Sequence, residues 1–286
     1  MFIERKKNFC HMIKISIITV CYNSKAYIEQ TIKSVLAQTY ENIEYIVIDG
    51  GSTDGTIDII NRYRKDITIF ISEPDRNMYD AINKGMKWAT GDYIAILNSD
   101  DFYLDNEVIS VIADKLKGLP SYYKGLYGNL QKFTAEGYFM KRKKGIPVGF
   151  KTLLCSRKLT FVGHGTLFIS QKACDEVGLY DFEQFSAAAD YDYVLRLFKT
   201  FKFKYVNCDI MGFRVHEASI TSSGRILEES YAVLCKNGYK NILFLERVIR
   251  YYASWSYFVL VNFRNMRKTN WRHFFNRCNY TIITVF

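Results

Sequence analysis

Residues 16–56 read SIITVCYNSKAYIEQTIKSVLAQTYENIEYIVIDGGSTDGT, and this stretch decides the fold. It overlaps two apolar runs rich in β-branched side chains, ISIITV at 15–20 and IEYIVI at 43–48. Such runs are typical of strands that are buried on both faces of a sheet. Between them, residues 24–38 place apolar side chains on one helical face. The order strand, helix, strand predicts a parallel βαβ unit.

The same alternation continues to about residue 100. Helical periods lie at 56–64 and 78–89, and further β-rich runs lie at 67–71 and 93–97. We therefore expect an α/β fold with a mostly parallel sheet flanked by helices. Ligands of such sheets bind at the carboxyl ends of the strands. Three polar clusters follow strand ends in this way: Thr19–Asn23, Asp49–Asp54 and Asn98–Asp101.

The pattern changes beyond about residue 122. Residues 127–133 and 137–142 predict a hairpin, with a basic run at 141–144. Further segments predict a strand at 167–170, a helix at 188–201 and strands at 205–207 and 211–216. We expect residues 1–225 to form one domain and residues 226–286 to form an amphipathic helical appendage.

The composition indicates a globular protein. Hydrophobic residues make up 49% of the 286 residues, which is enough for a sizeable core and argues against disorder. The seven cysteines are scattered and include no C-x-x-C pair. The sequence therefore supports neither a zinc knuckle nor a dithiol motif, and it suits a reducing compartment.

The C-terminal tail carries most of the net charge. Residues 241–286 hold seven Arg or Lys and one acid, so they supply six of the ten formal positive charges, together with twelve aromatic residues. This mixture predicts an anionic, partly apolar partner, such as a membrane surface or a nucleic acid. We favour the membrane, because no nucleic-acid-binding module is recognisable. No uncharged apolar run reaches the roughly 20 residues of a spanning helix, so we expect peripheral contact.

An acidic pair closes the fourth predicted strand. Asp100 and Asp101 follow an apolar segment directly, in the sequence ILNSDD. Two adjacent carboxylates at a partly desolvated strand end repel each other unless a positive charge lies between them. Carboxylate oxygens are the ligands that Mg²⁺ and Mn²⁺ prefer, usually together with substrate phosphates. The pair therefore predicts a divalent cation, Mn²⁺ or Mg²⁺, that holds a diphosphate. The alternative is a solvated acidic turn.

Three segments together resemble one protein family. They are residues 16–56, SEPDRNMYDAINKGMKWATGDYIAILNSDD at 72–101 and AADYDYVLRLF at 188–198. They are similar to the inverting glycosyltransferases of family 2, which have the nucleotide-sugar-binding fold called GT-A and include enzymes of bacterial surface-polysaccharide synthesis. The similarity is dense over 13–104, sparse to about 220 and absent from the tail.

The resemblance implies an activity and its partners. The first domain is expected to transfer a sugar from a nucleotide-diphosphate donor, a UDP-sugar, to an acceptor that is either a saccharide or a saccharide linked to a polyprenyl diphosphate. The reaction would contribute to a cell-surface polysaccharide, at the inner face of the bacterial cytoplasmic membrane. The tail would then contact the membrane surface.

The resemblance also implies site residues. Asp49 would accept the imide N–H of uracil, although it could instead only cap the following turn. Asp100 and Asp101, with His216, would bind the metal. The nucleotide would contact Thr19, Tyr22, Asp49, Arg76, Asp80, Asn83, Lys84, Asn98 and Asp100. His164 is a weaker candidate for an acceptor contact.

The general base is expected near the start of the helix at 188–201. By the resemblance it is Asp190, which would deprotonate the acceptor hydroxyl. Asp192 is the alternative base, and both acids could instead only stabilise a helix N-terminus. The sequence departs from the family pattern at Asn98 and at Ala189, where relatives commonly have acids.

Two other functions remain open from the sequence. The departures at Asn98 and Ala189 keep a non-catalytic nucleotide-sugar-binding module possible. A sugar nucleotidyltransferase shares the sheet plan, but it needs a Gly-rich basic loop after the first strand. TVCYNSKAY at 19–27 stands there instead, so we discount this reading.

Overall fold

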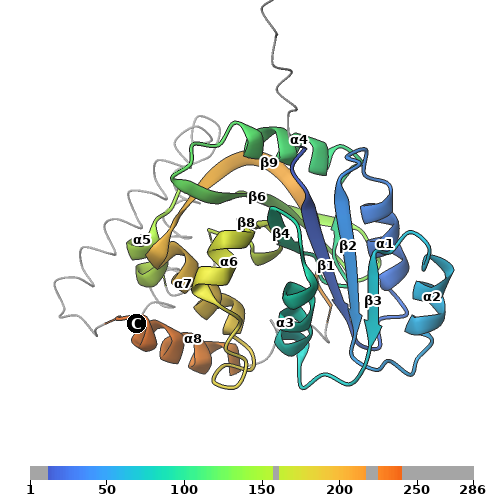
Figure 1. Ribbon diagram of the computed structural model, residues 1–286. Helices are drawn as coiled ribbons and strands as arrows, with labels where there is room; N and C mark the ends of the chain where they lie inside the picture. Colours follow the sequence, from blue (N-terminus) through green and yellow to red (C-terminus); the bar gives the residue numbers. More distant parts are fainter. Residues whose placement is uncertain (1–11, 157–160, 217–224, 240–286) are drawn as a thin grey trace, which may run out of the picture. The chain divides into compact units, whose positions relative to one another are not determined.

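The computed structural model describes residues 12–156, 161–216 and 225–239. The predicted tail helix lies mostly outside these residues. Helices and strands alternate in the first half, where β1 (Ile15–Cys21), β2 (Ile43–Asp49), β3 (Ile69–Ser72) and β4 (Tyr93–Ile96) alternate with α1 (Ile28–Leu36), α2 (Thr56–Arg62) and α3 (Met78–Trp88). These strands lie side by side and are all parallel (Figure 1). The predicted βαβ order is confirmed.

The second half continues the same sheet with mixed directions. Its strands are β5 (Phe102–Tyr103), β6 (Tyr123–Phe133), β7 (Phe139–Lys143), β8 (Phe168–Ser170) and β9 (Lys202–Arg214). The order is β3-β2-β1-β4-β8-β6-β9-β5, and β7 pairs with β6. β8 runs antiparallel to both β4 and β6. The expected mostly parallel sheet thus describes the first four strands, and the whole sheet is mixed.

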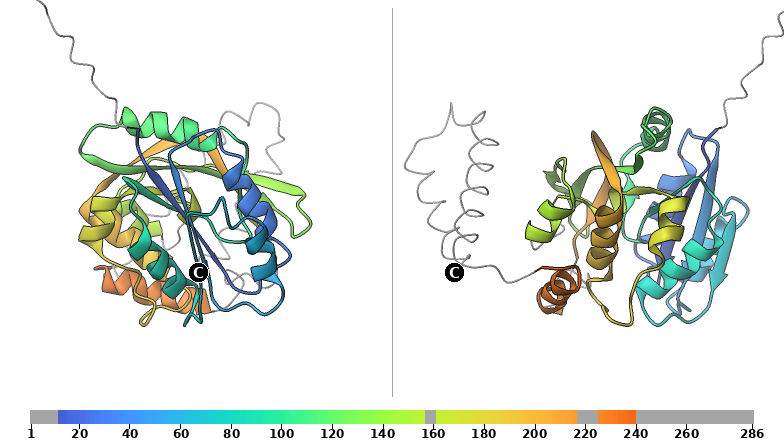
Figure 2. Two further views of the ribbon diagram at one scale, coloured as in Figure 1. Left: turned by 45° about the vertical axis from the view of Figure 1, so that its right-hand side comes forward. Right: turned by 60° about the vertical axis from the view of Figure 1, so that its left-hand side comes forward.

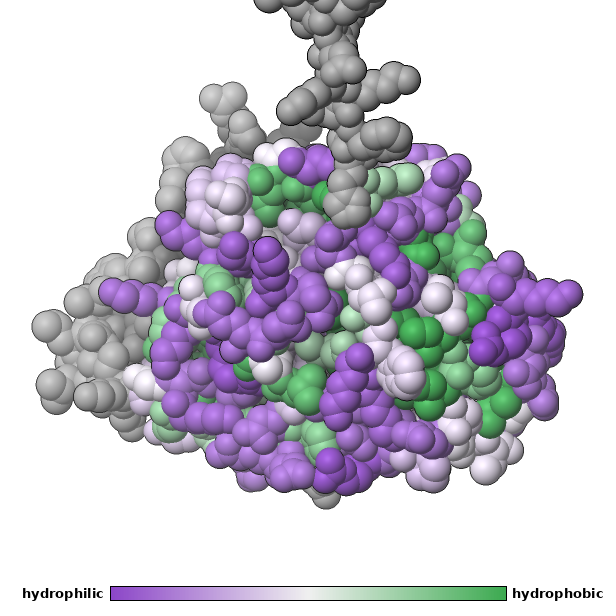
Figure 3. Space-filling view, viewed as in Figure 1, coloured by the Kyte–Doolittle hydropathy of each residue, from purple (hydrophilic) through white to green (hydrophobic). Residues whose placement is uncertain are grey.

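Helices cover both faces of the sheet. The remaining helices are α4 (Val108–Lys117), α5 (Phe150–Ser156), a 3-10 turn η1 (His164–Thr166), α6 (Gln171–Val177), α7 (Ala189–Thr200) and α8 (Arg225–Lys236). One buried cluster joins the sheet to α1, α2 and α4, and the other joins it to α3, α6 and α7. Figure 2 shows both layers from two further sides. Hydrophilic side chains cover most of the face in Figure 3.

Strand β1 shows why the sequence produces this layering. Ile15 and Ile17 pack into the α1 cluster, whereas Ile18 and Val20 pack into the α3 cluster. Side chains alternate between the faces of a strand, so a strand covered on both sides must be apolar at successive positions. Gly85 lets α3 approach closely, because a Cβ there would lie 2.4 Å from Ile18 Cγ2.

Several boundaries differ from the prediction for local reasons. Helix α1 begins at Ile28 rather than at residue 24, because the carbonyl of Ser24 accepts hydrogen bonds from Tyr27 N and Ile28 N and closes a turn first. The predicted hairpin is confirmed as β6 and β7. Within the described residues, no helix has both the length and the apolar character to cross a bilayer.

The compact unit extends beyond the expected boundary at residue 225. Helix α8 packs on α7, and its Val233 and Leu234 are fully buried in the main core. Contacts hold the unit together as far as Tyr239. The division at 225 rested on a change of sequence pattern, which does not reveal that α8 has an apolar face fitted to the core.

Candidate active site

The three polar strand ends meet at one edge of the sheet, as expected. Strand β1 pairs in register with β2 so that Cys21 lies opposite Asp49. In the loops that follow, Asn23 N donates to Ser52 Oγ at 2.8 Å, and Ser24 Oγ lies 2.8 Å from Ser99 Oγ. Asn23 has a φ of 48°, a left-handed conformation that Asn tolerates. This edge is the place where α/β sheets bind ligands.

Asp49 shapes the turn after β2. Its side chain is fully buried. Asp49 Oδ2 accepts hydrogen bonds from Gly51 N and Ser52 N, both at 3.0 Å, and from Ser72 Oγ at 2.7 Å. The structure therefore shows the turn-capping role that the sequence left open. The predicted contact with uracil stays a prediction.

The two candidates at the end of β1 differ in accessibility. Thr19 is fully buried, and its hydroxyl accepts a hydrogen bond from Tyr45 Oη at 3.2 Å. A nucleoside therefore cannot reach the Thr19 side chain without displacing the core. Tyr22 is 66% exposed and lies beside Gly50, so its ring is available to a ligand.

The acidic turn after β4 is held from several sides. Thr31 Oγ1, on α1, donates to the carbonyls of Ser99 and Asp101 at 2.8 and 2.7 Å. Arg214, which is buried at the end of β9, donates from its backbone N to Asp101 Oδ1 at 3.2 Å and from Nε to the carbonyl of Asp100 at 3.2 Å. The turn is thus fixed before any ligand arrives.

The two acids have different surroundings. Asp101 is 2% exposed, and burial, with the neighbouring charge of Asp100 as the next cause, raises its pKa well above the usual value. Asp100 is partly exposed, and its Oδ2 lies 2.8 Å from His216 Nε2. Asp100 and His216 can therefore reach a ligand. The Asp101 side chain is closed off from solvent and accepts a hydrogen bond from Arg214 N. The sequence assigned both acids to the metal, with Asp100 favoured as the direct ligand and Asp101 close by.

The donors on this turn fit a divalent cation in part. No group of three or more His, Cys, Asp or Glu side chains with metal-site geometry occurs among the described residues. The site offers one carboxylate and one imidazole, and Mg²⁺ and Mn²⁺ commonly complete such a set with water and substrate phosphates. Asn98 Oδ1 is buried and has no hydrogen-bond partner. A buried carbonyl oxygen without a partner is costly, so it points to a ligand.

The four candidates around α3 contact other protein groups. Arg76 pairs with Glu183 at 2.7 Å, and its backbone N donates to Asp80 Oδ2. Lys84 pairs with Glu73 at 2.8 Å and with Asp75. Asn83 exchanges two 2.9 Å hydrogen bonds with the backbone of Tyr180. In this structure Asn83 joins α3 to the segment before α7, and a nucleotide contact by Arg76 or Lys84 requires them to exchange partners.

Asp190 lies in the first turn of α7, partly exposed. Its Oδ1 accepts hydrogen bonds from Tyr191 N at 2.8 Å and from Tyr79 Oη at 3.2 Å. His164 is close by, with its Nε2 2.7 Å from Tyr180 Oη. Burial lowers the pKa of His164, and the negative charge of Asp190 opposes this shift. Sequence reasoning missed Tyr79, which only tertiary packing brings to Asp190.

Asp192 has a structural role. It is fully buried, and its Oδ2 accepts from Arg196 Nε at 2.7 Å, while Asn237 Nδ2 donates to Oδ1 at 3.1 Å. A carboxylate held by a cation and closed off from solvent cannot take a proton from an acceptor hydroxyl. Of the two acids that the sequence offered, only Asp190 is accessible.

Helix α8 supplies a third acid to the start of α7. Glu229 Oε2 accepts hydrogen bonds from Ala187 N at 2.7 Å and from Ala188 N at 2.9 Å. Burial opposes ionisation of Glu229, but these backbone N–H groups and Ser186 outweigh it and lower its pKa. A carboxylate at a helix N-terminus is stabilising. Ala189 stands where relatives commonly have an acid, and it is buried and carries no charge. The acid at this helix start is instead Glu229 of α8, a contact that no pattern in the sequence predicted.

Comparisons with known proteins agree with this geometry. Residues 16–178 match the family described as Glycosyl transferase family 2. An uncharacterized glycosyltransferase of Mycobacterium tuberculosis is 32% identical over 185 residues, which cover 64% of this chain and 68% of the relative. WfaP of Escherichia coli, a UDP-Glc:alpha-D-GlcNAc-diphosphoundecaprenol beta-1,3-glucosyltransferase, is 42% identical over 103 residues, 34% of this chain and 39% of WfaP.

Among solved structures, the fold is similar to that of TarS from S. aureus. The TarS 1–349 structure in complex with UDP has a TM-score of 0.59 and 18% sequence identity, and the match covers 79% of this chain. This chain spans 65% of that TarS chain, slightly less than two thirds. At this identity the likeness concerns the fold. Together with the family match, these findings show that the chain belongs to glycosyl transferase family 2 and is a glycosyltransferase with the GT-A fold.

Proposed function

We propose that this protein transfers a sugar from UDP to a saccharide carried on a polyprenyl diphosphate, with inversion at the anomeric carbon, in the biosynthesis of a cell-surface polysaccharide. One observation carries the proposal. An accessible Asp100–His216 pair lies where three strand ends meet, and an accessible acid, Asp190, lies in the first turn of α7, where Tyr79 of α3 donates to it. WfaP, which is named for a UDP-Glc donor and a diphosphoundecaprenol acceptor, supports the choice of substrates.

The chemistry needs one base from the chain. The acceptor hydroxyl oxygen attacks the anomeric carbon and forms the new glycosidic bond, while the bond from that carbon to the phosphate oxygen breaks. The hydroxyl proton passes to Asp190, and the electron pair leaves with the nucleotide diphosphate. The hydrogen bonds from Tyr79 and Tyr191 both reach Asp190 Oδ1, so they orient the carboxylate and Oδ2 takes the proton. A single displacement inverts the configuration.

Members of this family with the GT-A fold generally depend on a divalent metal. Asp100 and His216 would hold the cation, Mn²⁺ or Mg²⁺, and Asn98 would bond the ribose or a metal-bound water. The bound cation would supply positive charge to the leaving diphosphate. Asp101 would hold the turn in place by accepting the hydrogen bond from Arg214 N. Asp49 would read the uracil once the base displaces one of its present donors.

The acceptor places the enzyme at a membrane. We propose peripheral association with the inner face of the bacterial cytoplasmic membrane. The basic and aromatic composition of residues 241–286 supports this, since such segments bind anionic lipid surfaces.

A thermal-shift screen tests the donor and the metal. The full chain is heated with UDP-, GDP- or dTDP-sugars, each with and without Mn²⁺. We expect stabilisation by UDP-sugars that depends on Mn²⁺ and is lost in Asp100→Ala. If only GDP-sugars stabilise the protein, the donor is a GDP-sugar and not a UDP-sugar. If Mn²⁺ and a UDP-sugar stabilise Asp100→Ala as much as the parent, Asp100 does not bind the metal.

A turnover assay tests the reaction. We expect transfer from the stabilising donor to a synthetic saccharide diphosphopolyprenol, with the anomeric configuration of the product opposite to that of the donor by NMR. Saturable UDP binding without transfer or hydrolysis, across a panel of donors and acceptors, would favour a binding module. Retained configuration would overturn the single-displacement mechanism.

A further inference from the structure

An exposed apolar tip distinguishes the β6–β7 hairpin. We call residues 134–144 the basic hairpin. It includes the turn after β6 and all of β7, and it projects from the rest of the sheet in the left view of Figure 2. Tyr138, Phe139 and Met140 are exposed by 73, 59 and 50%. Three successive residues point to alternate sides of the backbone, so the tip presents apolar surface on both of its sides.

Four cationic residues, Lys141–Lys144, follow the tip directly. Lys141 lies opposite Lys132 of β6. Burial lowers the pKa of Lys143, and the neighbouring Lys132 and Lys141 lower it further; burial and then Lys141 do the same for Lys132. Lysines that depress one another's pKa gain stability when an anion approaches.

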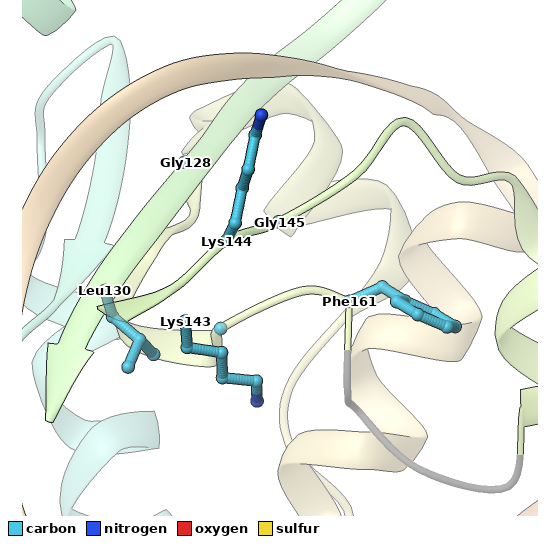
Figure 4. Close-up of a pocket in the computed structure, with 7 residues that line it drawn as sticks. Gly128, Leu130, Lys143, Lys144, Gly145 and Phe161 are labelled. Atoms are coloured by element: carbon cyan, nitrogen blue, oxygen red, sulfur yellow. The ribbon is translucent and has the colours of Figure 1, made fainter. Parts of the chain in front are cut away.

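At the base of the hairpin, Lys143 and Lys144 place positive charge on two sides of the strand. Lys143 and Lys144 line a shallow depression with Gly128, Leu130, Gly145, Phe161 and Gly163. Their side chains point in opposite directions (Figure 4). The positive charge therefore surrounds the strand and does not form a single flat face.

The basic hairpin is also joined to the catalytic edge. Arg214 Nη1 donates to the carbonyl of Ala135 at 2.8 Å, and the Arg214 Nε donates to the carbonyl of Asp100. Val215 N donates to the carbonyl of Phe133 at 2.9 Å. One buried side chain thus spans from the hairpin turn to the acidic turn, which places the hairpin turn beside the proposed donor site.

We propose that the basic hairpin docks on an anionic phospholipid bilayer, with Tyr138, Phe139 and Met140 inserted at the headgroup level and Lys141 and Lys144 at the phosphates. An apolar tip flanked by basic residues matches the layered chemistry of that interface. A nucleic acid fits less well. Bases stack on a flat aromatic platform, whereas this tip is apolar on both sides and includes a methionine.

An alternative use of the charges is protection of an edge strand. Among the described strands, β7 pairs with β6 alone, and lysines on such an edge discourage pairing with other chains. That role explains the charged part of β7. It does not explain the apolar tip, because exposed aromatic residues on an edge favour association.

Docking here adds a second membrane contact to the proposed function, distinct from residues 241–286. It does not require a UDP donor. Only its benefit rests on the proposed lipid-linked acceptor, since the hairpin would hold the donor site at the surface where a polyprenyl diphosphate lies.

The first test measures vesicle binding of the full chain without donor. Sedimentation compares phosphatidylcholine vesicles with vesicles containing phosphatidylglycerol. We expect Tyr138→Ser/Phe139→Ser/Met140→Ser and Lys141→Gln/Lys144→Gln each to weaken binding to the anionic vesicles by about tenfold. The matched control, Tyr122→Ser/Lys65→Gln, changes an exposed aromatic and an exposed lysine elsewhere and should bind like the parent.

The second test reports on the hairpin itself, so binding by residues 241–286 cannot mimic it. Phe139→Trp should shift its emission to the blue with anionic vesicles and should be quenched by brominated lipids, whereas Tyr122→Trp should show neither effect. Unchanged Phe139→Trp emission, or hairpin variants that bind as the control does, would overturn the proposal. Hairpin-dependent binding of single-stranded RNA in place of vesicles would overturn it in favour of a nucleic acid.

Turnover separates this proposal from the proposed function. The hairpin variants should retain donor hydrolysis and lose transfer chiefly to an acceptor embedded in anionic vesicles. Equal losses with a detergent-solubilised acceptor would show that the hairpin acts in the reaction and not in docking. Vesicle binding without any transferase activity would leave the docking intact and count against the proposed function alone.

Discussion

The His216 Nε2 lies 2.8 Å from Asp100 Oδ2, although the two residues are 116 positions apart in the chain. Asp100 comes from the turn after β4, and His216 follows β9 beyond the buried Arg214. Tyr27 stacks on the His216 ring with the centroids 5.3 Å apart. The pair therefore depends on β9 returning to the catalytic edge, and it joins the first half of the sheet to the second at the place where the diphosphate is proposed to lie.

We predict that His216→Ala and Asp100→Ala each abolish the stabilisation by Mn²⁺ in the presence of UDP. Each variant removes one of two ligands that act together, so the double variant should lose no more than either single variant. A thermal-shift cycle over the four proteins measures this coupling. Asp114→Ala removes an acid on α4 whose side chain is 79% exposed, and it should respond as the parent does. Additive losses would show that the two residues act separately.

We predict opposite phenotypes for the two acids of α7. Asp190→Asn should lower kcat by about 10²–10⁴-fold with an unchanged melting temperature, because it removes the base while the amide keeps the hydrogen bond from Tyr79. Asp192→Asn should destabilise the fold by about 3 kcal/mol, because it leaves Arg196 without a buried counter-ion. Urea unfolding and initial-rate measurements separate the two effects. Full activity in Asp190→Asn would remove its assignment as the base.

The first half of the fold could be predicted from the sequence because each signal was local. Strands β1 and β2 are rich in buried Ile and Val on both faces, and α3 carries its cap, Asn77, whose side chain accepts from Tyr79 N and Asp80 N. Strand β9 was predicted as two short strands, since polar residues interrupt its apolar pattern. The structure keeps it continuous because Asp209, within that interruption, pairs with Arg142 and Asn129 across the sheet.

The site was predictable only to the level of segments. The sequence identified the acidic turn and the start of α7, but the choice between Asp190 and Asp192 depends on which side chain faces Arg196 inside the core. Glu229 and Arg214 act through backbone groups of distant segments. Such contacts follow from tertiary packing, and no local pattern announces them.

We predict an acid-sensitive contribution to stability from Glu44. Burial opposes its ionisation, but hydrogen bonds from Lys14, Ser16 and Thr90 outweigh this and lower its pKa from 4.5 to about 2. A lowered pKa in the folded state stabilises the protein above pH 4.5, and the contribution is lost as the pH falls from 4.5 towards 2.

Glu44→Gln isolates this contribution. At pH 7 the free energy of unfolding should be larger for the parent than for the variant. This difference should shrink by on the order of 3 kcal/mol between pH 7 and pH 2. Urea titrations across this range measure the difference. A gap between parent and variant that stays constant with pH would contradict the lowered pKa of Glu44.

We predict that the catalytic unit ends near residue 239 and not at 225. A chain that stops after residue 225 loses the buried Val233 and Leu234, worth about 2 kcal/mol each, and the Glu229 cap. It should unfold at lower urea concentration than a chain that stops after residue 239.

Glu229→Gln changes the same contact without shortening the chain. It should lower the free energy of unfolding by about 1 kcal/mol and lower kcat without raising KM, because the start of α7 orients Asp190. Equal stability of the two shortened chains would place α8 outside the catalytic unit.

We predict that Asn98→Asp makes the protein more dependent on metal. Asn98 Oδ1 is buried without a partner beside the acidic turn, so a carboxylate there would be repelled by Asp100. Without metal the melting temperature should fall below that of the parent, and Mn²⁺ should raise it by more than in the parent, because the cation gains a charged ligand. Differential scanning fluorimetry over a range of Mn²⁺ concentrations measures both effects.

Asn98→Ala is the matched control, since it removes the amide without adding charge and should not strengthen the Mn²⁺ response. If Asn98→Asp were destabilised equally with and without Mn²⁺, the turn would bind no cation at this position, and the free oxygen of Asn98 would belong to the nucleotide instead.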